Sequence, residues 1–157
     1  MKKMIAALLL LSISISVNAD SMWSCTGTAK VKRIYPSKFT LKIQASFNVE
    51  LSDDGTMMSD NHITSPVGGI FQLSSSRKKA YIYPDMSDVA DSVYEANPSI
   101  SDFQVISYTT TMKFNKPIET ATKATHRSYV FEQFYNEYNT LIQVKIRAVS
   151  KCIRTSW

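Results

Sequence analysis

The chain has few of the residues that form most recognisable sites. Its 157 residues include only four glycines, two cysteines and two histidines. So little glycine excludes collagen-like and low-complexity chains. His62 and His126 do not form a metal site by their spacing, because zinc needs three or four Cys, His or carboxylate ligands. We therefore expect no metal and no cofactor.

Catalytic motifs are also missing. No serine stands in a G-x-S-x-G setting, which marks the nucleophile of many hydrolases. Asp85, Asp88 and Asp91 recur every three residues, unlike the alternating ligands of a calcium loop. The short basic run at residues 77–79 is typical of a solvated turn. The sequence predicts a protein that is not an enzyme.

Only one apolar run is long, and it lies at the N-terminus. Lys2 and Lys3 precede a stretch of about 13 apolar or small residues (5–17), too short to span a bilayer. Val17 and Ala19 then place small residues where a signal peptidase needs them. We interpret residues 1–19 as a cleaved secretory signal of bacterial type, with a membrane anchor as the alternative. The protein is then exported, to the periplasm in the first place, with the extracellular space left open.

The mature chain, residues 20–157, is one domain long. It keeps 138 residues, enough for a single hydrophobic core. Removing the signal takes away two lysines and no acid, which lowers the formal net charge from +5 to +3. That charge is too small for a typical nucleic-acid-binding domain. We expect no nucleic acid as a partner.

Two cysteines, Cys25 and Cys152, stand near opposite ends of the mature chain. In an oxidising compartment an isolated pair of cysteines forms a disulfide, the alternative being two buried thiols. The bond would close a loop of 127 residues. The sequence predicts one disulfide-stapled domain.

Alternation of apolar and polar residues predicts strands through most of the chain. Residues 39–51 alternate without a break, from Phe39 to Leu51, and Asp54-Gly55 then signals a hairpin that returns toward Ile63. Further strands are expected at residues 23–31, 70–73, 79–83, 103–115 and 142–152. Residues 127–138 fit a strand or a helix, and their aromatic content favours the strand.

One helix is expected between the strands, at residues 85–98. Met86, Val89 and Val93 form an apolar stripe at helical spacing, Ser87 can cap the start, and Pro98 ends it. About eight strands in hairpin order, with the first and last joined by a disulfide, favour closure, which removes exposed edges. We predict an all-β fold: a small antiparallel up-and-down barrel with one short inserted helix. A two-layer β-sandwich is the alternative.

A basic surface follows from the predicted disulfide. If the first and last strands pair antiparallel with Cys25 opposite Cys152, Lys30 lies opposite Arg147 and Lys32 opposite Lys145, all facing outward. Like charges across a ladder are destabilising. Attraction to an anionic partner would explain them, such as a polyanionic glycan, a lipid headgroup surface or an acidic protein. The alternative, which the sequence favours, is that the positive charges keep the seam soluble and prevent edge pairing.

These observations favour a non-enzymatic binding module of the bacterial envelope. One alternative is a carrier, lipocalin-like in architecture only, with a small apolar ligand in the barrel. Inward-facing Trp23, Phe39 and Phe47 instead predict a mostly filled interior. A small outer-membrane barrel is a further alternative. It fits less well. The alternate residues that lead up to Trp157, on the same face of the last strand, include Lys151 and Arg147, and this face is too polar to contact lipid.

Overall fold

The computed structural model describes residues 20–60 and 68–156. The predicted signal, His62 and Trp157 lie outside the described residues. Within the described residues, no helix has the length and apolar character needed to cross a bilayer.

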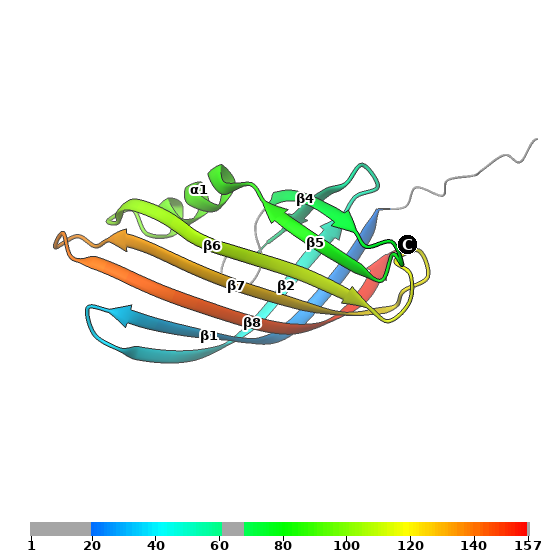
Figure 1. The fold of residues 1–157 in the computed structure, drawn as a ribbon, viewed down its shortest axis with the longest axis horizontal. Coiled ribbons are helices and arrows are strands. Elements are labelled where there is room, and N and C mark those ends of the chain that lie inside the picture. The colour runs from blue at the N-terminus through cyan, green and yellow to red at the C-terminus, as the bar shows by residue number, and fades with distance from the viewer. Residues whose placement is uncertain (1–19, 61–67, 157) are drawn as a thin grey trace, which may run out of the picture.

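Eight antiparallel strands form a closed barrel, as predicted, rather than a two-layer sandwich (Figure 1). Each strand pairs with its neighbours in the chain, and β8 returns to pair with β1. The elements in order are β1 (Ser21–Tyr35), β2 (Phe39–Leu51), β3 (Thr56–Ser59), β4 (Gly68–Leu73), β5 (Lys79–Pro84), α1 (Met86–Ala96), β6 (Ser101–Phe114), β7 (Lys123–Tyr135) and β8 (Leu141–Ser156).

Most strands lie where the alternation predicts them. The ambiguous segment 127–138 is strand as far as Tyr135, so the helical alternative is wrong. Gly55 takes a positive φ of 87° in the turn after β2, a conformation that glycine adopts at little cost. β3 is shorter than expected: it ends at Ser59 and Asp60 is a bend, and residues 61–63 of the predicted return strand lie outside the described residues.

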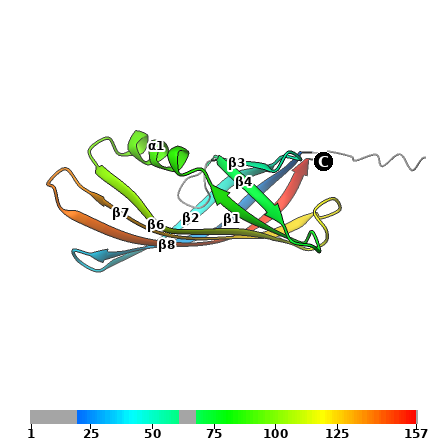
Figure 2. The ribbon, with the colours of Figure 1, turned by 45° about the horizontal axis from the view of Figure 1, so that its top comes forward.

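Unequal strand lengths divide the barrel into two halves. β2 pairs with β3 only from Val49 to Leu51, and β6 pairs with β5 only from Thr110 to Lys113. In this closed half all eight strands complete the ring. β6, β7, β8, β1 and β2 continue beyond it as a curved five-stranded sheet, here called the open half (Figures 1 and 2).

The closed half contains the larger core. Trp23, Phe47, Met112 and Phe114 are buried there, and the rings of Trp23 and Phe114 lie 5.3 Å apart. The predicted disulfide is present between strands β1 and β8, within the same core.

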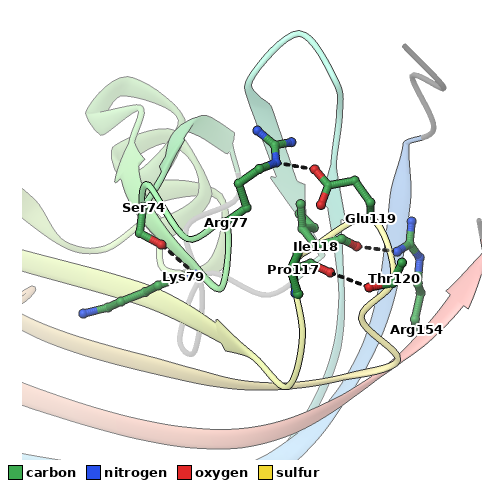
Figure 3. A network of polar contacts seen from close by, with 8 residues as sticks. All are labelled: Ser74, Arg77, Lys79, Pro117, Ile118, Glu119, Thr120 and Arg154. Carbon is green, nitrogen blue, oxygen red and sulfur yellow. Dashed lines mark hydrogen bonds and ion pairs between the residues drawn. The ribbon is translucent and has the colours of Figure 1, made fainter. Parts of the chain in front are cut away.

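Two loops cover the end of the closed half (Figure 3). The guanidinium of Arg154 lies 5.6 Å from the Trp23 ring and donates a 2.7 Å hydrogen bond to the carbonyl of Ile118. Arg77 pairs with Glu119 across the two loops. Ile118 belongs to the loop between β6 and β7 and is itself buried. This end of the barrel is therefore held shut by specific contacts.

Among residues 20–60 and 68–156, the loop contacts of this end have no counterpart at the opposite end, which corrects one expectation. Phe39 and Leu41 have the inward parity of β2 but are 54% and 47% exposed. They lie in the open half, where β2 has no β3 residue beside it among the described residues. Phe39 therefore does not help to fill the interior, although Trp23 and Phe47 do.

Helix α1 lies beside the open half, on the side where β3, β4 and β5 fall short (Figure 2). Its N-cap is Asp85 rather than the predicted Ser87. The Asp85 carboxylate accepts a 2.9 Å hydrogen bond from the Ser87 amide. The Tyr94 hydroxyl accepts a 2.9 Å hydrogen bond from the amide of Phe103 on β6, which fastens the helix to that strand.

Candidate functional site

The β1–β8 seam carries the basic residues predicted from the cysteines. Cys25 is paired with Cys152, and the same register places Lys30 opposite Arg147 and Lys32 opposite Lys145. Neutral Val31 and Ile146 stand between the two pairs and point inward. The structure thus brings together all four basic side chains that the sequence singled out.

β2 adds a fifth cation. Lys42 is the partner of Lys30 on the other side of β1. We call the group Lys30, Lys32, Lys42, Lys145 and Arg147 the cationic face. In the described part of the chain, no carboxylate lies within salt-bridge distance of any of the five. Each like-charged pair across a ladder costs a fraction of a kcal/mol, roughly 0.2–1.

Two aromatic rings on β7 lie under this face. The Lys145 ammonium is 5.0 Å from the centre of the Phe131 ring, and the Arg147 guanidinium is 5.4 Å from that of Tyr129. A cation over an exposed ring gains roughly 0.5–1 kcal/mol, which offsets the repulsion between the cations. The rings hold two of the charges in place on the surface.

More basic residues continue along the same outer wall toward the closed half. They are exposed and belong to β6, β7 and β8: Lys113, Lys123, Arg127 and Lys151. Four of the thirteen acidic residues lie together elsewhere, at α1 and its cap: Asp85, Asp88, Asp91 and Glu95. The net charge of the protein is small, but its basic and acidic residues are distributed unevenly over the surface.

Inside the barrel the structure reveals a polar group that sequence reasoning missed. Thr110 on β6, His126 and Ser128 on β7, and Ser150 on β8 are at most 4% exposed. Their register makes them neighbours, since Thr110 is paired with Ser128 and His126 with Ser150. Together with Tyr108 we call them the interior polar strip.

The strip has unsatisfied hydrogen-bonding capacity. Within the described residues, no partner completes a hydrogen bond to the buried atoms Tyr108 Oη, Thr110 Oγ1, His126 Nδ1, His126 Nε2, Ser128 Oγ and Ser150 Oγ. Buried polar atoms are usually paired, and an unpaired one costs about 1–3 kcal/mol. Five such side chains lie together in the barrel interior.

Burial also changes the ionisation of this region. It lowers the pKa of His126 to about 4, so the imidazole is neutral at pH 7. It raises the pKa of the Tyr108 hydroxyl, and the nearby Ser128 and Thr110 hydroxyls offset only part of that rise. Glu132 lies four residues beyond Ser128 on β7 and is partly buried, and this burial raises its pKa to about 7.

Small residues surround the strip on the neighbouring strands. Ala29 on β1 and Ala148 on β8 are buried and paired with each other. Gly27 is paired with Ser150, and an added Cβ would lie 2.1 Å from the Val149 carbonyl oxygen. The two backbones approach too closely there for any side chain.

The signal for the strip was present in the sequence as inward parity. His126, Ser128 and Glu132 alternate with outward residues on β7. That these polar residues are buried together, however, can be recognised only when the pairing of β6, β7 and β8 is known. His62 lies outside the described residues, which contain no group of three or more His, Cys, Asp or Glu residues arranged to hold a metal ion. Comparisons with protein-family models, with curated proteins and with solved structures found no match.

Proposed function

We propose that this protein is an exported, non-enzymatic binding module of the bacterial envelope that docks an anionic partner through its cationic face. The observation that carries the proposal is the pairing of Lys30 with Arg147 and of Lys32 with Lys145, with Lys42 added beside them. Attraction to a partner explains why repelling charges are kept together.

The partner that fits this surface best is a polyanionic glycan. The cations follow strands on the convex wall of a barrel, and alternate residues on one strand are about 6.6 Å apart. A flexible polymer can follow that curved wall, whereas a flat lipid surface would meet it along a line. The rings of Tyr129 and Phe131 keep Arg147 and Lys145 raised on the wall where such a chain would pass.

The disulfide and the polar outer wall of the barrel support this proposal. A disulfide such as Cys25–Cys152 is typical of exported proteins, since thiols stay reduced in the cytosol. An outer wall with Lys30, Lys42 and Arg147 also favours an aqueous setting over the small outer-membrane barrel, because a lipid-facing wall needs an apolar band.

Binding to an immobilised sulfated polysaccharide tests the proposal. The mature chain, oxidised, is compared with a Lys30→Gln, Lys32→Gln, Lys145→Gln, Arg147→Gln variant at low salt and at about 0.15 M salt, where charges are screened beyond about 8 Å. We expect at least about a fourfold loss of affinity, because four exposed charges at roughly 0.2–1 kcal/mol each are removed.

A matched pair of double variants removes the same charge from two places. Lys78→Gln, Lys116→Gln changes two exposed loop positions outside the cationic face and the basic wall that continues it, and this variant should keep most of the affinity, whereas Lys32→Gln, Lys145→Gln should not. Vesicles of anionic lipid form a second arm and should bind more weakly than the polysaccharide. Equal binding by wild type and the first variant at both salts would leave the cationic face as a solvated surface only.

A further inference from the structure

The outer wall formed by β7 and β8 carries positive charge over most of its length and no negative charge. β8 contains no Asp or Glu, and neither does its other neighbour, β1. The single acid of β7, Glu132, has inward parity and is paired with buried Val144. The two strands lie side by side along most of the barrel, from the open half into the closed half (Figure 1).

The register of β7 with β8 distributes the basic residues of this wall evenly. Five successive outward pairs each join one basic and one uncharged residue: Phe131–Lys145, Tyr129–Arg147, Arg127–Val149, Thr125–Lys151 and Lys123–Ile153. We call the five basic residues of these pairs the basic track. Successive pairs are about 6.6 Å apart along the strands, so the basic track is about 26 Å long.

The uncharged partners of the basic track are mostly apolar and accessible to solvent. Val149 is 51% exposed and Ile153 is 61% exposed, although both belong to a strand whose outward face meets water. The rings of Tyr129 and Phe131 lie beside the first two cations, as described above. Charged and apolar contacts therefore alternate along one line on the surface.

This alternation fits the chemistry of a linear acidic polysaccharide. Such a chain carries anionic groups at regular intervals, and each sugar ring between them has a face of carbon-bound hydrogens. The anionic groups are attracted to the cations, and the ring faces can remove exposed apolar side chains from water. A small inorganic anion would use only one cation and none of the apolar side chains.

The positive charge continues further along the strands than across them. At the level of Arg147, the row of cations passes through Lys30 to Lys42 and ends with β2. On the other side of Arg147 the row meets only Tyr129 and then Thr109 of β6, which are uncharged. The direction of β7 and β8 is therefore the longest path that a polyanion can follow from one cation to the next.

We propose that a linear acidic polysaccharide binds in extended form along β7 and β8, with its anionic groups at successive residues of the basic track and its sugar rings against their uncharged partners. This inference rests on the proposed function, because Lys145 and Arg147 belong to both the cationic face and the basic track. It adds a direction, a minimum chain length and three further contact residues: Arg127, Lys151 and Lys123.

Size-defined oligosaccharides of heparin, from the disaccharide to the dodecasaccharide, test the length of the site. Calorimetry at low salt measures the affinity of the oxidised mature protein for each of them. We expect the affinity to rise with chain length until the oligosaccharide spans about 26 Å, by at least about fivefold in total, and then to level off. A site limited to the cationic face would reach its full affinity with shorter chains.

A matched pair of variants assigns the added contacts. Arg127→Gln, Lys151→Gln removes two charges from the middle of the basic track and leaves all five residues of the cationic face in place. Its affinity for the dodecasaccharide should fall at least about twofold, and its dependence on chain length should weaken. Lys78→Gln, Lys116→Gln removes two exposed charges from loops and should change neither. Circular dichroism checks the fold of each variant.

Amide NMR shifts on adding the dodecasaccharide test the direction of the bound chain. Shifts that follow β7 and β8 from Lys145 to Lys123 support the proposal. Shifts that instead run from Arg147 through Lys30 to Lys42 would place the chain across the strands and overturn it.

Failure of this inference can be distinguished from failure of the proposed function. If no oligosaccharide binds the wild type, both are overturned. The basic track alone is overturned if binding depends on the cationic face but not on chain length, or if Arg127→Gln, Lys151→Gln behaves like the loop variant.

Discussion

The closed and open halves of the barrel use the same strands for different purposes. In the closed half, Trp23, Phe47 and Met112 pack as a continuous core around the disulfide. In the open half, small and aliphatic residues such as Ala29 and Ile146 face an interior that retains unpaired polar groups at its boundary. The closed half thus contains the larger buried apolar cluster, and the open half leaves inward-parity side chains such as Phe39 and Leu41 exposed.

Loss of the disulfide should have the largest effect. A Cys25→Ala, Cys152→Ala variant removes a bond that closes a 127-residue separation. The chain-entropy model assigns roughly 4–5 kcal/mol to such a loop. At about 3 °C per kcal/mol, the melting temperature should fall by more than 10 °C. Calorimetry of the oxidised wild type and of the variant measures the two melting temperatures. A fall of only a few degrees would show that the closed half is stable without the disulfide.

Two phenylalanines on the inward parity of β2 compare the halves directly. Phe47 is 2% exposed in the closed half, and Phe47→Ala should lower the free energy of unfolding by about 3–5 kcal/mol. Phe39 is 54% exposed in the open half and contacts Arg33, so Phe39→Ala should cost about 1 kcal/mol or less.

Urea unfolding measures both changes, with Gln44→Ala on the exposed outward face as the control, expected within about 0.5 kcal/mol. Similar costs for Phe39→Ala and Phe47→Ala would mean that the open half is as tightly packed as the closed half.

The two titrating groups of the interior should oppose each other. The pKa of His126 is lowered to about 4, so the unfolded chain takes up that proton first and stability falls as pH drops from about 6.5 to 4. The pKa of Glu132 is raised to about 7, so the native chain keeps that proton and stability falls as pH rises from about 4.5 to 7.

Glu132→Gln removes the contribution of Glu132 to the pH dependence of stability and keeps that of His126. Relative to wild type, the variant should gain stability as pH rises from about 4.5 to 7, by up to about 3 kcal/mol at 1.36 kcal/mol per unit of pKa. Urea unfolding of both proteins across this range gives the difference. A difference that does not change with pH would place Glu132 in water rather than in the wall of the open half.

The sequence predicted the strands and their register more fully than the shape of the barrel. Strict alternation from Phe39 to Leu51 matches β2 residue for residue, because one wet and one dry face is the direct consequence of a half-buried strand. The parity of the two cysteines was enough to place Lys30 opposite Arg147. Both inferences depend on local periodicity and one covalent bond.

What the sequence did not predict depends on contacts between distant segments. Phe39 looks inward by parity, but its burial depends on the length of β3, which ends before reaching it. His126 and Ser128 look like ordinary strand residues until β6 and β8 bring Thr110 and Ser150 beside them. The cap at Asp85 was missed for a local reason, since both Asp85 and Ser87 suit the start of a helix.

Native-state amide hydrogen exchange tests the division into two halves most directly. Closed-half amides, such as those of Val49 and Met112, should exchange only through global unfolding, because strands pair on both sides of them. Open-half residues of β2 and β6, such as Leu41 and Val105, have a paired strand on one side only among the described residues and should exchange through local opening, at least about a hundredfold faster. Equal protection in the two halves would contradict the account.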